Sequence, residues 1–73
     1  MNSKTQPLLV KFGKKVRQER EKRNLSQEEL GFKCELDRTY ISGIERAVRN
    51  PSLITLAKIA KALKMNLSDL LSF

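Results

Sequence analysis

The chain has 73 residues, enough for one domain with a small core, since a chain of this size buries only about 60% of its unfolded surface. Hydrophobic residues make up 40% and charged residues 32%, which is typical of a folded soluble domain and argues against disorder. Lys and Arg outnumber Asp and Glu by 15 to 8, and the resulting charge of +7 favours an anionic partner, either nucleic acid or an acidic membrane.

The first predicted element is a helix that follows a short polar arm. Residues 1–7 have little to bury and are expected to form a flexible arm, which leaves residues 8–73 as the folded domain. Pro7 suits the first turn of a helix, where its missing N–H is not needed. This helix should end near Arg23, with Asn24 in a left-handed conformation. The apolar positions that recur at helical spacing are Leu9, Phe12 and Val16.

Two short helices are predicted next. Ser26 and Glu29 have the spacing of a capping box, which begins a helix that runs through Cys34. Asp37 is an N-cap residue for a third helix, which ends near Arg46. Only two residues separate the helices. This arrangement is typical of a helix-turn-helix, in which two helices cross at roughly 90–120°.

Two more helices are predicted in the last third of the chain. Residues 50–52, Asn-Pro-Ser, have turn and cap chemistry and precede a fourth helix. Asn66 is predicted to cap a short fifth helix, with Asp69 in its first turn. No segment alternates with period 2 for long enough to be a strand, so the sequence predicts an all-α, compact five-helix domain. The apolar face of the fourth helix is expected to contain Leu53, Leu56, Ile59, Ala60 and Leu63.

The segment from Gln27 to Arg46 also has small and apolar residues where a helix-turn-helix needs them. Gly31 is the small residue at which the two backbones can approach each other. The expected shared core consists of Leu30, Cys34, Leu36, Ile41 and Ile44. The outward face of the third helix is then left with Arg38, Thr39, Ser42, Gly43 and Arg46, and Tyr40 lies at its border.

These motifs resemble those of the Cro/phage-repressor (XRE-type) regulators. The similar segments are residues 27–30 (Gln-Glu-Glu-Leu), residues 36–46 and residues 49–63, within a resemblance that extends over about residues 9–71. The resemblance implies a lambda-repressor-like fold and a transcriptional regulator that binds a palindromic operator in double-stranded DNA as a homodimer. Within the family, the chain looks most like the controller proteins of restriction–modification systems. One turn position that is often Gly in the family is Glu35, and a left-handed conformation there costs on the order of 1 kcal/mol.

The resemblance also implies which residues contact DNA. Arg38, Thr39 and Ser42 are expected to read bases, because Arg can bond bidentately to guanine and Thr can reach a base edge or a thymine methyl. The nearby Lys14, Lys15, Lys22 and Arg23 are expected to supply a general electrostatic field. The alternatives are a solvated charge for Arg38 and core packing for Tyr40. The residues expected at the DNA backbone are Gln27, Tyr40, Arg46, Arg49, Asn50 and Arg17.

Other residues are expected to have structural roles. In the family, the residues that correspond to Arg20 and Glu45 form an inward-turned ion pair between the first helix and the third, which is the recognition helix that enters the major groove. Cys34 is expected in the core. The C-terminal apolar residues cannot all face one small core, so some should form a dimer interface, unless Phe73 simply frays. The residues predicted at that interface are Met65, Leu67, Leu71 and Phe73.

Catalysis is not expected. There is no His, and one Cys cannot form a metal cluster, so the sequence predicts no enzyme, metal or cofactor. A chain this short leaves no room for an effector domain, so no small-molecule ligand is expected either. RNA polymerase is a further expected partner, through the acidic pair Glu28–Glu29.

The expected location is the cytoplasm. No apolar run approaches the roughly 20 residues of a membrane span, and the start lacks the apolar stretch of a signal peptide. Two rival functions remain. An interaction module without specific DNA binding should have an acidic or apolar face on the third helix, and a peripheral membrane binder needs an amphipathic helix with spare apolar residues.

Overall fold

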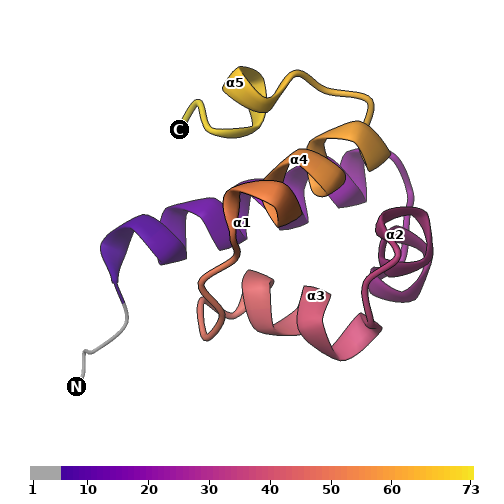
Figure 1. Ribbon diagram of the computed structural model, residues 1–73, viewed down its shortest axis with the longest axis horizontal. Coiled ribbons are helices and arrows are strands. Elements are labelled where there is room, and N and C mark those ends of the chain that lie inside the picture. Colours follow the sequence, from indigo (N-terminus) through magenta and orange to yellow (C-terminus); the bar gives the residue numbers. More distant parts are fainter. Residues whose placement is uncertain (1–5) are drawn as a thin grey trace.

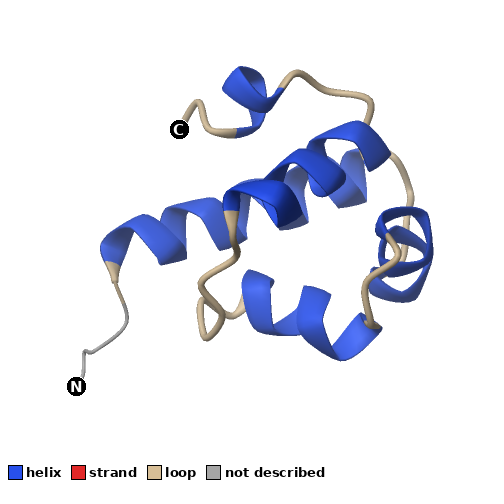
Figure 2. Cartoon of the chain, viewed as in Figure 1, coloured by secondary structure: helices blue, strands red, loops and turns tan. Residues whose placement is uncertain are grey.

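The structure is a computed structural model that describes residues 6–73. These residues form α1 (Pro7–Lys22), α2 (Gln27–Cys34), α3 (Arg38–Glu45), α4 (Leu53–Ala62) and α5 (Leu67–Leu70), as Figure 1 shows. The described part of the chain contains helices and loops and no strand, which confirms the all-α prediction (Figure 2). Most of the predicted arm, residues 1–5, lies outside the described residues.

The helices pack in a chain of contacts that centres on the helix-turn-helix. Helix α3 packs against both α1 and α2, α4 packs against α2, and α5 packs against α4. In Figure 1, α5 and the C-terminus lie at the top and α3 at the bottom, so the two ends of the bundle are well separated. No helix within residues 6–73 is both long enough and apolar enough to cross a membrane.

Side-chain caps fix where three of the helices begin. The Ser26 hydroxyl accepts a hydrogen bond from the Glu29 amide at 2.9 Å, and the Glu29 carboxylate accepts one from the Ser26 amide at 2.7 Å. This is the predicted capping box. Asp37 begins α3 by accepting from the Thr39 amide, and Ser52 likewise begins α4. The prediction for α5 was only half right, since Asn66 occupies the N-cap position but makes no side-chain capping bond.

A residue in the left-handed conformation follows each of the first four helices. Asn24 follows α1 with φ 56°, as predicted, and Glu35 ends α2 with φ 61°. The Glu35 conformation turns the chain so that the Leu36 amide donates to the Gly31 carbonyl at 2.8 Å. Glu35 therefore occupies a turn position at which Gly would cost less, and the rest of the fold must offset a penalty on the order of 1 kcal/mol.

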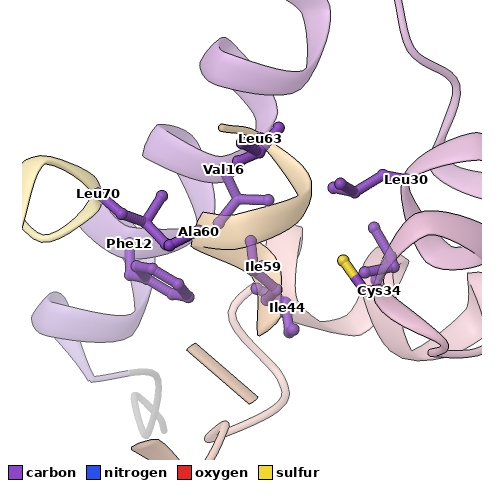
Figure 3. Packing of buried hydrophobic residues seen from close by; sticks show 10 residues of the cluster. Phe12, Val16, Leu30, Cys34, Ile44, Ile59, Ala60, Leu63 and Leu70 are labelled. Carbon is purple, nitrogen blue, oxygen red and sulfur yellow. The ribbon is translucent and has the colours of Figure 1, made fainter. Parts of the chain in front are cut away.

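All five helices contribute to one apolar core, most of which Figure 3 shows. Helix α3 places Ile41 and Ile44 in it, as predicted, whereas Leu36 is only partly buried. Burial raises the pKa of the Cys34 thiol to about 11, so the thiol is protonated and inert at neutral pH. The other buried members are Phe12, Val16, Leu30, Ile59, Ala60, Leu63 and Leu70.

Two leucines at the beginnings of helices do not face the core, and one of them, Leu53, was expected to. Leu53 is 67% exposed and Leu8 is 65% exposed. Both lie in the first turn of their helices, whereas the buried residues of α4 lie in its second half, where α2 and α5 can cover them. Leu53 and Ala60 have the spacing of residues on one side of a helix. This periodicity does not say which part of the helix is covered by its neighbours.

Two glycines allow helices to approach closely. A Cβ atom on Gly31 would lie 2.5 Å from the Leu36 carbonyl oxygen, which confirms its predicted place at the crossing of α2 and α3. A Cβ atom on Gly13 would lie 2.6 Å from the Ile44 carbonyl oxygen and 2.8 Å from that of Glu45. The second contact, between α1 and the end of α3, was not predicted from the sequence.

A buried carboxylate at Glu19 connects α1 to the end of α4. The Arg23 guanidinium lies 2.7 Å from the Glu19 carboxylate and donates to the Leu63 carbonyl at 2.8 Å. Lys15 and Lys22 also lie within ion-pair distance of Glu19. Hence three of the four residues assigned to a general electrostatic field also have a partner within the chain. The Arg23 hydrogen bond is the main reason that the pKa of Glu19 falls to about 2, against the opposing effect of burial.

The Glu19 network predicts a loss of stability in acid. A carboxylate with a depressed folded-state pKa stabilises the fold above its unfolded pKa of 4.5, and this contribution disappears as the pH falls from there to about 2. We expect Glu19→Gln to remove about 1 kcal/mol at neutral pH, after allowance for partly exposed cations, and to flatten the pH dependence in that window. Urea unfolding of both proteins at several pH values measures this. Parallel pH profiles would contradict it.

Candidate nucleic-acid interface

The solvent face of α3 carries the polar residues that were predicted to read DNA. Arg38 and Thr39 are exposed in its first turn, and Ser42 is half-buried one turn later. The Arg46 guanidinium donates to the Ser42 hydroxyl at 3.3 Å, which aligns the two side chains along the same face. The structure therefore brings these four residues together on one surface of the recognition helix.

Arg49 is fixed across this surface by two contacts. Its guanidinium carbon lies 5.5 Å from the centre of the Tyr40 ring, a cation–π contact. Its aliphatic part covers Gly43, where a Cβ atom would lie 2.6 Å from the Arg49 Cγ atom. The prediction that Gly43 faces outward was thus wrong, because Arg49 from the following loop buries it. Sequence spacing within α3 could not show this cover.

The Glu45 carboxylate is the electrostatic centre behind the interface. Its side chain is fully buried. Arg20 donates to it twice, from Nε to Oε2 at 2.7 Å and from Nη2 to Oε1 at 3.0 Å. Burial by itself would raise the pKa of Glu45, but the hydrogen bonds from Arg20 and Gln27 outweigh it and hold that pKa below its usual value. Arg20 and Glu45 therefore form the inward ion pair that the resemblance implies, and it connects α1 to α3.

Two residues that were predicted to contact the DNA backbone, Gln27 and Arg17, belong to the same network. The Gln27 side-chain nitrogen Nε2 donates to Glu45 Oε1 at 3.0 Å, and the Arg17 Nε donates to the same oxygen at 3.4 Å. Arg17 remains about half exposed, and Gln27 begins α2. Glu45 thus holds one side chain from α1 and one from α2 at the end of α3. No motif in the sequence indicated this coupling.

The residues predicted at a dimer interface separate into two groups. Met65 and Leu67 are half-buried against the protein's own core. Leu71 is 40% exposed and Phe73 is 47% exposed, although the Phe73 ring lies 6.4 Å from that of Phe12. A small apolar hollow of about 110 Å³ borders both exposed side chains. It is also lined by Leu8, Leu9, Phe12, Asn50, Pro51 and Leu56.

Comparison with known proteins agrees with this geometry. A family model described as Helix-turn-helix matches residues 16–70. The control protein C.BamHI of Bacillus amyloliquefaciens is 54% identical over 70 residues, which cover 94% of this chain and 86% of that protein. The control protein C.MunI of a Mycoplasma species is 47% identical, over 86% of each chain. The crystal structure of the restriction–modification controller protein C.AhdI of Aeromonas hydrophila is 47% identical, with a TM-score of 0.84, and covers 85% of this chain and 94% of that one.

The fold and these matches define the class of the protein: the chain belongs to the XRE-type helix-turn-helix family of DNA-binding transcription regulators. Within this family it is similar to the restriction–modification controller proteins. These relatives are transcription regulators and not enzymes.

The Glu45 network predicts a large cost for losing Arg20. We expect Arg20→Ala to destabilise the fold by about 3–5 kcal/mol, because a buried carboxylate loses its ionic partner. The loss should lie near the lower limit, since Gln27 and Arg17 still donate to Glu45. Replacing both Arg20 and Glu45 with apolar residues should recover much of it. Thermal and urea unfolding of the single and double variants measure the coupling, and strictly additive losses would show that the pair is not coupled.

The cover over Gly43 predicts separate effects for two glycines. Gly43→Ala should leave the fold intact, because the clashing Arg49 side chain can move, but DNA binding should weaken as Arg49 leaves the recognition surface. Gly13→Ala should instead cost about 2 kcal/mol or more of stability, because its Cβ would meet rigid backbone oxygens. Unfolding curves and operator titrations of both variants test this. Unchanged DNA affinity for folded Gly43→Ala would contradict a role for Arg49 placement.

Proposed function

We propose that the chain regulates transcription as a restriction–modification controller, by binding a palindromic DNA operator as a homodimer. The observation that carries this proposal is the polar, cationic face of α3, on which Arg38 and Thr39 are exposed and Arg49 is held across Tyr40. A helix of this kind fits the major groove. The cytoplasm is the expected site of action, and no catalytic step is part of the proposal.

Base reading is assigned to the start of α3, and positioning to the residues around it. Arg38 has the length and the fork of donors to reach guanine, while Thr39 and Ser42 are short and suit closer base edges. Gln27 and Arg17 come from α2 and α1, both donate to Glu45, and are proposed to contact the flanking phosphates. Tyr40, Arg46, Arg49 and Asn50 are proposed to contact the backbone of the same half-site.

The homodimer is proposed to form through the C-terminal apolar surface. Leu71 and Phe73 are exposed beside an apolar hollow that the beginning of α1 and the end of the chain share. An exposed apolar surface on so small a domain is a favourable association site. One copy reads few base pairs, and a two-fold interface doubles that footprint and requires a palindrome.

RNA polymerase is proposed as a second macromolecular partner. Glu28 and Glu29 are exposed in the first turn of α2, and the neighbouring Phe32 is 86% exposed. The chain as a whole has a charge of +7, but this local pair of carboxylates beside an aromatic side chain is complementary to a basic protein surface. The alternative function, an interaction module without specific DNA binding, is less well supported because the face of α3 is neither acidic nor apolar.

The proposed division of contacts predicts two kinds of DNA-binding defect. Arg38→Ala should relax base preference at one or two positions of each half-site and cost about 1–3 kcal/mol against the preferred base. Gln27→Ala should weaken binding to all sequences alike, because its proposed contact with DNA is to phosphate and not to a base. Selection from random duplex DNA with each variant, beside the wild type, compares them. An unchanged selected motif for Arg38→Ala would show that another residue reads those bases.

The proposed interface predicts the behaviour of a charged variant. Leu71→Glu should give a folded monomer with much weaker operator binding, because a carboxylate cannot be buried unpaired between subunits. Phe32→Glu is the matched control, since it places the same charge on an exposed apolar residue of α2 and should leave the dimer intact. Sedimentation equilibrium measures both, and an intact dimer for Leu71→Glu places the interface elsewhere.

A further inference from the structure

A second cationic site lies between the ends of α2 and α4, away from the recognition surface. Four lysines, Lys33, Lys58, Lys61 and Lys64, line one hollow of about 490 Å³. Cys34 and Ala62 form its apolar part, and Glu35 is its one acidic lining residue. None of the residues proposed to contact DNA lines this hollow.

The lysines of the hollow have no carboxylate partner in the described part of the chain. Lys15 and Lys22 pair with Glu19, whereas no ion pair involves a lysine of the hollow within residues 6–73. Lysine near a helix C-terminus complements the helix dipole, and this accounts for Lys33 and Lys61, which lie in the last turns of α2 and α4. It does not account for Lys58, which precedes the last turn of α4.

The shape of the hollow restricts the anion that it could take. Lysine binds phosphate as a mobile point charge, and several lysines around one concavity suit a compact group with several negative charges. A volume of about 490 Å³ suits a small group rather than a long stretch of DNA backbone. We propose that this hollow binds an oligophosphate group, such as the polyphosphate chain of a small molecule. This departs from the expectation of no small-molecule ligand. The sequence could not show the hollow, because it forms only where α2 packs on α4.

The proposal makes a structural connection to the recognition unit. A ligand held by Lys33 on one side and by Lys58 and Lys61 on the other would join α2 to α4. Helix α2 begins at Gln27 and ends at the hollow, where the lysine side chains, and not the helix dipole, would hold the anion. The oligophosphate and the operator could therefore be bound at the same time.

Inorganic triphosphate is the probe for the test. Amide chemical shifts of the full chain, titrated with triphosphate at physiological ionic strength, should change at residues 33–35 and 58–64 rather than on α3. The double variant Lys58→Gln/Lys61→Gln should lose at least tenfold in triphosphate affinity. The control Lys11→Gln/Lys14→Gln removes the same charge from exposed positions of α1 and should lose less than twofold.

Several outcomes would overturn the proposal. Equal losses in the two double variants would show a general field effect. Shift changes confined to α3, or complete displacement of triphosphate by a short duplex, would show that the probe binds the recognition surface. Operator affinity of Lys58→Gln/Lys61→Gln should stay within about threefold of the wild type, so failure of the oligophosphate site can be distinguished from failure of the DNA-binding function.

Discussion

The buried carboxylate of Glu45 is the constraint on which the recognition surface depends. A charge removed from water must be compensated inside the protein, and here four hydrogen bonds from Arg20, Gln27 and Arg17 do so. These donors come from α1 and from the start of α2, while Glu45 is the last residue of α3. One side chain therefore fixes the recognition helix relative to two others, and any shift of α3 would break several charged contacts together.

Close backbone packing supports the same arrangement. Gly13 lets α1 approach the last carbonyl groups of α3, directly beside the Glu45 network, and Gly31 lets α2 approach the turn. On the outside, Arg49 lies over Gly43 and Tyr40 and completes the surface from the following loop. The recognition helix is thus held from three sides, which suits a surface that must keep its shape while it reads DNA.

The positive charge of the chain is divided among places with different physical roles. Arg20 and Arg23 lie against carboxylates and carbonyls and hold helices together. Arg38, Arg46 and Arg49 are exposed at α3 and its following loop, where an anion can reach them. The lysines around the end of α2 form a third group without carboxylate partners. A net charge by itself indicates an anionic partner, but only the pairing of each cation shows which charges remain free to bind one.

Local signals in the sequence determined the helices, since capping at Ser26 and Asp37 and the left-handed residue Asn24 act within a few residues of the chain. The same spacing predicted the core positions Leu30, Ile41 and Ile44, and family resemblance supplied Arg20 with Glu45. Tertiary structure alone decided the rest. Leu53 is exposed, Gly43 is covered by Arg49, and Arg23 donates to the Leu63 carbonyl, because each depends on how another element is placed. Periodicity says which side of a helix is apolar, but what covers that side depends on how distant segments meet.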